Sequence, residues 1–120
     1  MNIQPTILIA DRNPNVRKYL QREMINAGYQ VRLAENSREL ISWVHSQPPV
    51  SLIIVDPDLP DVEKKALFAN IRKCSDVPVV VHSYGEQEAA EEGFWFVEKC
   101  ANSIEWIKRI VQQILHPVNA

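Results

Sequence analysis

The sequence has 120 residues, of which 46% are hydrophobic, and its 13 basic and 15 acidic residues nearly balance. This length suits a single globular domain over residues 1–120, and the charge balance excludes the strong positive field with which proteins recruit nucleic acid or anionic membranes. There is no apolar run of membrane-spanning length, and the first residues lack the basic region and long apolar core of a signal peptide, so we expect none. We therefore expect a cytoplasmic protein that binds neither nucleic acid nor a membrane directly.

The chain begins with a predicted strand and a predicted helix. Residues 6–10 form a short apolar run rich in β-branched side chains, typical of a buried strand, and the run ends at Asp11. Asn13 followed by Pro14 is typical of a helix start, because asparagine caps the first turn and proline fits the first helical position. Apolar residues then recur at helical spacing until Gly28 closes the helix.

The second and third units repeat this pattern. Residues 29–33 alternate apolar and polar side chains, which indicates a strand at the edge of a sheet. Asn36, with Glu39 three positions later, resembles a capping box at the start of the next helix. Residues 52–55 are again apolar and β-branched, and this predicted strand delivers Asp56 to its carboxyl end. A helix with a weak apolar stripe follows.

The last two units complete the alternation of strands and helices. Residues 78–82 predict a fourth buried strand, and residues 94–97 predict a fifth. Asn102 and Glu105 repeat the capping-box spacing before the clearest apolar stripe in the chain, at residues 104–115. Five strand–helix units in succession predict an α/β fold with a parallel sheet and right-handed crossovers.

Polar residues stand at the ends of these predicted strands. Asp11, Asp56 and Ser83 end three of them, and Lys99 follows the fifth. In a sheet of order 2-1-3-4-5 these ends converge at the crevice where the strand order reverses. Together with Pro60, four residues after Asp56, the pattern resembles the receiver domain of two-component response regulators over essentially the whole chain. The resemblance implies a flavodoxin-like, doubly wound, five-stranded sheet and a signalling role rather than an enzymatic one.

The resemblance also implies a chemical role for each of these residues. Asp56 would be the phosphoacceptor, a carboxylate nucleophile. Asp11 and Asp56, with the backbone or carboxylate of Asp58, would hold Mg²⁺. Lys99 and the Ser83 hydroxyl would contact the phosphoryl oxygens. A histidine kinase or phosphotransfer protein would supply the phosphoryl group, and a downstream effector protein or output domain would receive the signal.

Four residues around the fourth and fifth strands have further expected roles. Ser83 and Phe96 would form the switch that responds to phosphorylation. Tyr84 stands where the family favours a small residue, and it would either cover the pocket or pack as a surface aromatic. His82 precedes Ser83, so strand alternation points it away from the pocket, as a packed or solvated histidine.

Arg12 departs from the family pattern, which places two acids in succession after the first strand. Asp11, Asp56, Arg12 and Lys99 carry no net formal charge, so the pocket loses its attraction for a dication. We expect Arg12 to point at Asp56 or Asp11 and to weaken Mg²⁺ binding, unless Asp58 supplies a replacement carboxylate. One alternative remains open, namely a pseudo-receiver interaction module in which Arg12 replaces Mg²⁺ and phosphorylation is lost.

The spacing before the fifth strand is also short. Only 15 residues separate Ser83 from Lys99, and residues 85–93 offer no apolar side chain larger than alanine. We therefore expect a shortened or missing fourth helix, with fewer than two turns. Its loss would expose Trp95, Phe94 or part of the last helix, and a homodimer partner could cover that surface.

Overall fold

A five-stranded parallel sheet forms the centre of the computed structural model, which describes residues 4–85 and 93–117. The strand order is β2-β1-β3-β4-β5, as predicted from the sequence, and β2 lies at one edge. The strands are β1 Thr6–Ala10, β2 Gln30–Ala34, β3 Leu52–Val55, β4 Val79–Ser83 and β5 Phe94–Glu98. The described helices are α1 Pro14–Asn26, α2 Ser37–Val44, α3 Lys64–Cys74 and α4 Ser103–Leu115.

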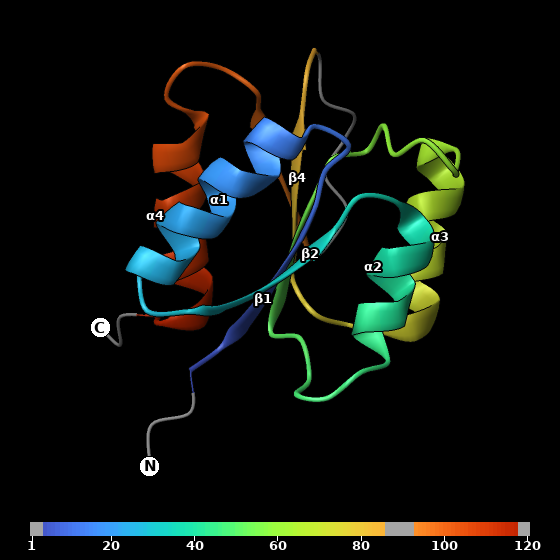
Figure 1. Ribbon diagram of the computed structural model, residues 1–120, viewed down its shortest axis with the longest axis horizontal. Helices are drawn as coiled ribbons and strands as arrows, with labels where there is room; N and C mark the ends of the chain where they lie inside the picture. Colours follow the sequence, from blue (N-terminus) through green and yellow to red (C-terminus); the bar gives the residue numbers. More distant parts are fainter. Residues whose placement is uncertain (1–3, 86–92, 118–120) are drawn as a thin grey trace.

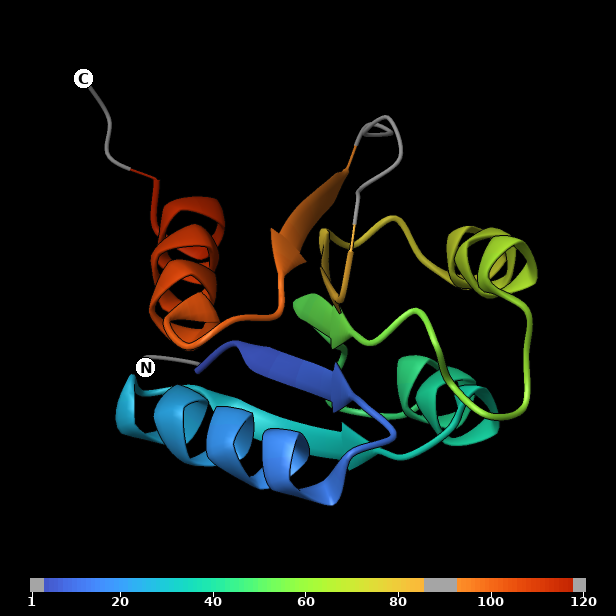
Figure 2. The ribbon, with the colours of Figure 1, turned by 90° about the horizontal axis from the view of Figure 1, so that it is seen from above.

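The helices cover both faces of this sheet (Figure 1), with α1 and α4 on one side and α2 and α3 on the other (Figure 2). Successive strand residues point to opposite faces, so the continuous apolar runs fill two separate cores. The α2/α3 cluster includes Leu8, Leu40, Ile53, Leu67 and Ile71. The α1/α4 cluster includes Ile7, Leu20, Ile54, Ile107 and Val111. None of the described helices is both long and apolar enough to cross a membrane.

Side-chain caps start two of the helices where the sequence predicts them. The Asn13 carboxamide accepts hydrogen bonds from two backbone N–H groups of α1, and Asn36 accepts one from the Glu39 N–H at 2.9 Å. The prediction for α4 is wrong in its detail. Asn102 precedes the helix but its side chain makes no capping bond, and its Oδ1 lies instead 3.1 Å from the Cys100 thiol.

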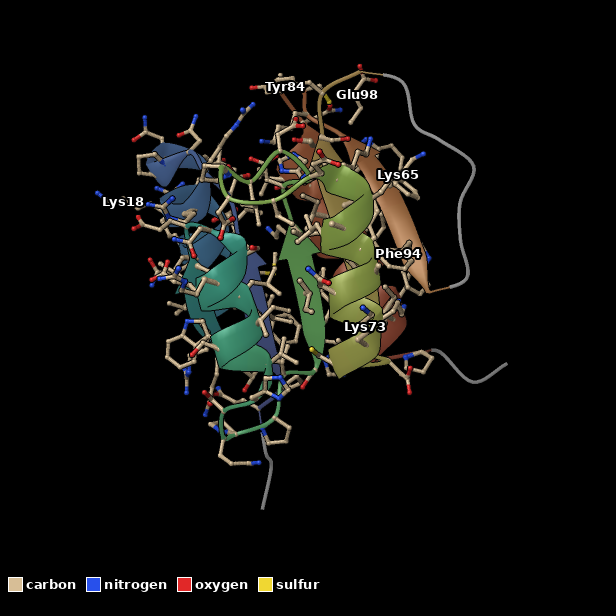
Figure 3. All side chains as sticks on the ribbon, turned by 90° about the vertical axis from the view of Figure 1, so that its right-hand side faces the viewer. Lys18, Lys65, Lys73, Tyr84, Phe94 and Glu98 are labelled. Carbon is tan, nitrogen blue, oxygen red and sulfur yellow. The ribbon has the colours of Figure 1, made fainter. Side chains whose placement is uncertain are left out.

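The predicted shortening of the fourth family helix falls on residues 86–92, which lie outside the described residues. The four described helices fit a receiver fold with that helix shortened. Of the alternatives given for an exposed surface, Trp95 of β5 and Trp106 of α4 are exposed, whereas Phe94 is buried. Its ring packs against Phe68 of α3, with ring centroids 5.3 Å apart, and Figure 3 shows it beside that helix. Self-association through this part of the surface remains a prediction.

The Arg72 side chain of α3 covers the other side of Phe94. Its guanidinium carbon lies 4.3 Å from the centre of the Phe94 ring, within the range of a cation–π contact. The same group donates hydrogen bonds to the backbone carbonyls of Val77 at 2.9 Å and Gly93 at 3.1 Å. Gly93 has a φ of 86°, and a Cβ there would lie 2.7 Å from the guanidinium. The positive φ therefore favours glycine at this point, and any other residue would also have to displace the Arg72 guanidinium.

Candidate functional site

The four residues predicted from strand ends meet at the carboxyl edge of the sheet. Asp11 follows β1, Asp56 follows β3, Ser83 ends β4 and Lys99 follows β5. Backbone hydrogen bonds continue just beyond the strands: the Asp56 N–H donates to the Ala10 carbonyl at 2.8 Å, and the Lys99 N–H donates to the Ser83 carbonyl at 2.7 Å. The sheet itself therefore fixes where these side chains start.

Lys99 joins the two aspartates. Its Nζ lies 3.2 Å from Asp11 Oδ2 and 3.7 Å from Asp56 Oδ2. The two carboxylate oxygens can be no farther apart than the sum of these distances, which is within the roughly 8 Å over which two carboxylates can share one hydrated ion. Asp11 and Asp56 are 2% and 1% exposed, so this charge cluster is almost fully withdrawn from water.

Arg12 contacts the same oxygen of Asp56, which confirms the orientation predicted for its side chain. The Nε atom lies 3.5 Å from Asp56 Oδ2, and the Arg12 backbone N–H donates to this oxygen at 3.4 Å. The far end of the guanidinium reaches outward, with one terminal nitrogen 4.0 Å from Asp58 Oδ2. The Arg12 side chain is 51% exposed and therefore lies between the buried pocket and solvent.

The remaining carboxylate oxygens have backbone donors. Asp11 Oδ1 accepts a hydrogen bond from the Asn13 N–H at 2.8 Å, and Asp56 Oδ1 accepts one from the Asp58 N–H at 2.9 Å. Burial raises the pKa of the Asp11 carboxyl; the Asn13 N–H opposes this, the Asp56 charge adds to it, and Lys99 also opposes it. The Asp58 carboxylate is half exposed and contacts only the outer end of Arg12 among the described ion pairs.

Ser83 and Tyr84 lie at the carboxyl end of β4 next to Lys99, whereas Phe96 is the central residue of β5. Ser83 is buried at the last position of β4, and Phe96 is half-buried against the α2/α3 cluster. Tyr84 is 66% exposed, and the Lys99 Nζ lies 5.1 Å from the centre of its ring. Figure 3 shows Tyr84 at the end of the molecule where the strands finish. Tyr84 is thus a surface aromatic whose ring also contacts the Lys99 ammonium.

Arg17 is a neighbour of the site that the sequence pattern did not single out. One terminal nitrogen donates to the Asp11 backbone carbonyl at 2.6 Å, and the other lies 3.6 Å from Glu35 Oε2. The only signal in the sequence is a cation in the first turn of a helix that follows a site aspartate, and such a residue is usually solvated. Arg17 fixes the backbone of Asp11 rather than its carboxylate.

His82 points away from the aspartates, as strand alternation predicts, and is buried on the α1/α4 side. Its Nε2 lies 2.9 Å from the Ser103 hydroxyl. Burial, and then the positive charge of Lys99, lower the pKa of His82 to about 4, while Asp56 acts in the opposite direction. His82 and Lys99 also line a cavity of about 380 Å³ between α1 and the start of α4.

The loop from β3 to α3 is anchored to the start of α2 by Asp61. Asp61 Oδ1 accepts a hydrogen bond from the Ser37 N–H at 2.8 Å, and Oδ2 accepts bonds from the Ser37 hydroxyl at 2.9 Å and the Arg38 N–H at 3.1 Å. Burial raises the pKa of the Asp61 carboxyl, but the hydrogen bonds from Ser37 and Arg38 together outweigh it, so the pKa lies below its usual value. The loop that carries Asp58 is therefore attached to a neighbouring helix.

The chain belongs to the response regulator receiver domain family, whose model matches residues 7–110. The match covers all five strands except the first residue of β1 and reaches into α4, so it includes every residue of the site described above. The matched range contains the aspartate after the third strand, the aspartate after the first strand and the lysine after the fifth.

Curated relatives match part of the chain. It is 38% identical over 79 residues to the DNA-binding transcriptional regulator NtrC of a Bradyrhizobium strain, covering 65% of this chain and 16% of that protein. It is 31% identical over 75 residues to the probable transcriptional regulator ycf27 of Galdieria sulphuraria, covering 62% of this chain and 29% of that protein. The chain thus spans less than a third of the length of these relatives.

Solved structures match nearly the whole chain. A two-component response regulator from Clostridium difficile has a TM-score of 0.85 at 25% identity, covering 98% of this chain and 100% of that one. A chain from the complex of histidine kinase ThkA with response regulator protein TrrA has a TM-score of 0.78 at 24% identity, covering 93% and 99%. At such identities the second likeness shows the fold alone.

Proposed function

We propose that this receiver domain accepts a phosphoryl group on Asp56. The observation that carries the proposal is the convergence of two cations, Lys99 and Arg12, on one oxygen of a buried aspartate at the carboxyl edge of the sheet. Phosphoryl transfer depends mainly on positioning and on neutralising the charge of the phosphoryl oxygens, and this arrangement supplies both. The donor would be a phosphohistidine on a histidine kinase or phosphotransfer protein.

The phosphoryl transfer would use the residues at this edge of the sheet and the phosphohistidine of the donor. A carboxylate oxygen of Asp56 bonds to phosphorus while the bond from phosphorus to the donor imidazole nitrogen breaks, and the imidazole leaves with the electron pair. Lys99 would then pair with the phosphoryl oxygens, and the Ser83 hydroxyl would turn toward them. A shift of Ser83 and Phe96 would pass the change to a downstream effector or output domain.

Receiver domains generally bind Mg²⁺ at the phosphorylation site, but the residues present here do not fit a divalent cation. The two buried carboxylates are balanced by Lys99 and Arg12, and all four of their oxygens lie near a donor or cation. Residues 4–85 and 93–117 hold no group of three or more histidine, cysteine, aspartate or glutamate side chains suited to a metal. An arginine about 6 Å from the ion would repel it by about 1–5 kcal/mol, depending on solvation.

The pseudo-receiver alternative, in which phosphorylation is lost, has no observation in its favour over this proposal. Arg12 opposes a dication, but it also places a positive charge where an incoming phosphoryl group needs one. The similar proteins named above are transcriptional regulators and response regulators, which is consistent with a phosphorylation-dependent output. We infer that the domain acts in the cytoplasm, where two-component kinases place their phosphoryl groups.

The test is phosphorylation by acetyl phosphate, followed by intact-protein mass spectrometry. We expect a mass increase of one phosphoryl group, and peptide mapping after hydride reduction should place it at Asp56. Asp56→Asn should remain unlabelled, whereas Asp76→Asn, a change at an exposed aspartate before β4, should be labelled like the wild type. Equal labelling of Asp56→Asn and wild type would refute the proposal.

A further inference from the structure

Two side-chain cations share the outer oxygen of the phosphoacceptor. Arg12 Nε lies 3.5 Å from Asp56 Oδ2 on the side of α1, and Lys99 Nζ lies 3.7 Å from the same atom on the side of β5. Lys99 is buried and is also held by Asp11 at 3.2 Å, whereas Arg12 is half exposed. The two cations therefore differ in freedom: Lys99 is fixed between two aspartates, and Arg12 can adjust to a group that arrives from solvent.

Arginine suits contact with a phosphoryl group better than contact with one carboxylate oxygen. Its guanidinium is planar, stays charged at all ordinary pH values and presents five N–H donors, which match phosphate oxygens in pairs. In this structure Nε and the backbone N–H of Arg12 approach Asp56, and one terminal nitrogen lies 4.0 Å from the exposed Asp58 carboxylate. The contact between Arg12 and Asp58 is long and exposed to water, so it contributes little stabilisation, and Arg12 can exchange it for a contact with a phosphoryl group.

The charge of the pocket points in the same direction. A carboxylate that holds one Mg²⁺ ion contributes a net charge of about +1, and a single guanidinium contributes the same charge. With Arg12 in place, the pocket is neutral before transfer and carries about one negative charge once a dianionic phosphoryl group is attached to Asp56. Arg12 therefore supplies about the same net positive charge as the family's acid together with a bound Mg²⁺ ion, but it supplies this charge from a side chain.

We propose that Arg12 acts as a built-in replacement for the divalent cation, so that Asp56 is phosphorylated without a metal ion. This inference rests on the proposed function and identifies Arg12 as a catalytic residue that contacts the transferred group. With acetyl phosphate as donor, an Asp56 oxygen forms a bond to phosphorus as the phosphorus–oxygen bond to the acetyl group breaks, and acetate leaves with the electron pair. Arg12 and Lys99 neutralise the equatorial oxygens during this exchange.

The test compares phosphorylation rates of metal-stripped protein in excess EDTA and in excess Mg²⁺, with acetyl phosphate as donor and intact mass as readout. Wild-type rates in the two conditions should agree within about threefold. Arg12→Asp should react with Mg²⁺ present and lose about a hundredfold or more of its rate in EDTA. Arg12→Lys should keep its reaction in EDTA at a reduced rate, because it retains the charge and loses the planar donor pair.

Two controls separate this role from a general effect of charge. Arg22→Asp makes the same change of charge on the exposed surface of α1, more than two turns from the site, and should behave as wild type in both conditions. Isothermal calorimetry with Mg²⁺ alone gives a readout that does not depend on the reaction. Arg12→Asp should bind Mg²⁺ at least about tenfold more tightly than wild type, because the repulsion is removed and a ligand is added.

The outcomes distinguish this inference from the proposed function. Wild-type labelling at Asp56 with Mg²⁺ but not with EDTA would overturn the inference and leave the proposed function intact. No labelling of wild type in either condition would overturn both. Equal Mg²⁺ affinity of wild type and Arg12→Asp would also contradict the inference, since Arg12 would then not occupy the position of the cation.

Discussion

His82 is buried beneath the cavity between α1 and α4, and only one nitrogen of its ring has a hydrogen-bond partner. Nε2 lies 2.9 Å from the Ser103 hydroxyl, and Nδ1 has none among the described residues. The protonated form would be buried next to the charge of Lys99, so the pKa falls to about 4. The folded chain therefore holds this side chain neutral at pH values where the unfolded chain begins to protonate it.

We expect the free energy of unfolding to fall as pH decreases from about 6.5 toward 4. The unfolded state binds more protons at His82 in this range, so the contribution is complete above pH 6.5 and is lost as pH falls. At pH 5 the loss from His82 should be about 2 kcal/mol relative to pH 7. Urea unfolding at the two pH values measures it.

The matched variants for this prediction are His82→Gln and His45→Gln. His45 follows α2 and is exposed. The difference in free energy between pH 7 and pH 5 should shrink by about 2 kcal/mol in His82→Gln and stay unchanged in His45→Gln. An unaltered difference in His82→Gln would show that other groups cause the pH dependence.

At the level of single residues, the sequence predicted the positions that backbone geometry alone determines. Asp11, Asp56 and Lys99 follow directly on strands, and parallel strands bring their carboxyl ends together. The orientation of Arg12 was predictable, because its positive charge lies next to two buried carboxylates and pairs with one of them. Arg17 was missed, since its partner is a backbone carbonyl that exists as an acceptor only once the loop after β1 has its shape.

Arg72 links α3 to the segment before β4 and to Gly93 just before β5. Its side chain hydrogen-bonds backbone carbonyls on both sides of β4 and covers the Phe94 ring. We expect Arg72→Ala to lower the free energy of unfolding by about 2–3 kcal/mol, through the lost hydrogen bonds and the lost cation–π contact. Urea unfolding measures this loss.

The neighbouring Lys73 provides a control on the same helix. Lys73 is exposed, and Lys73→Ala should change the free energy of unfolding by no more than about 0.5 kcal/mol. Equal effects of the two substitutions would mean that Arg72 is not a specific support for β5. Arg72→Lys should recover part of the loss at most, because one ammonium group cannot reach both carbonyls in the fork geometry of arginine.

Elements defined by local sequence were predicted well, and elements defined by distant contacts were not. The starts of α1 and α2 depend on side chains within three residues, so Asn13 and Asn36 identified them. The same spacing failed at α4, where the Asn102 side chain has a different partner. The burial of Phe94 was not predictable, because its cover comes from α3, more than 20 residues earlier in the chain.

The molecule as a whole has two apolar cores that share one sheet. Every central strand contributes side chains to both the α2/α3 cluster and the α1/α4 cluster, so neither core can lose its strands without disturbing the other. We expect a single cooperative unfolding transition in urea. Trp43 packs against the α2/α3 cluster and can report on it once Trp95 and Trp106 are replaced by phenylalanine.

Leu20→Ala tests this coupling from the opposite face. Leu20 is buried in the α1/α4 cluster, and its truncation should cost about 2–5 kcal/mol. The Trp43 fluorescence midpoint should fall together with the midpoint from far-ultraviolet circular dichroism, as it should for Leu67→Ala on the same face as Trp43. A Trp43 transition that Leu20→Ala leaves unmoved would show that the two layers unfold separately.

The order of strands and the two-layer arrangement were predictable, because five apolar runs alternating with helices leave few ways to bury both faces of a parallel sheet. The surface formed by β5 and α4 was not predictable in the same way. It depends on how the aromatic residues of β5 pack against α3, and nothing in the local pattern distinguishes buried Phe94 from exposed Trp95.

The attachment of Asp61 to α2 has a mechanical consequence for signalling. In the β3–α3 loop, the Asp58 N–H donates a hydrogen bond to the Asp56 carboxylate. Asp61 of the same loop accepts three hydrogen bonds from the first turn of α2. A displacement of this loop must therefore either break these three hydrogen bonds or move α2 as well. The phosphoacceptor loop is therefore coupled to α2, the helix that packs against β1 and β2, so a change at Asp56 can be transmitted to that part of the surface as well as to β4 and β5.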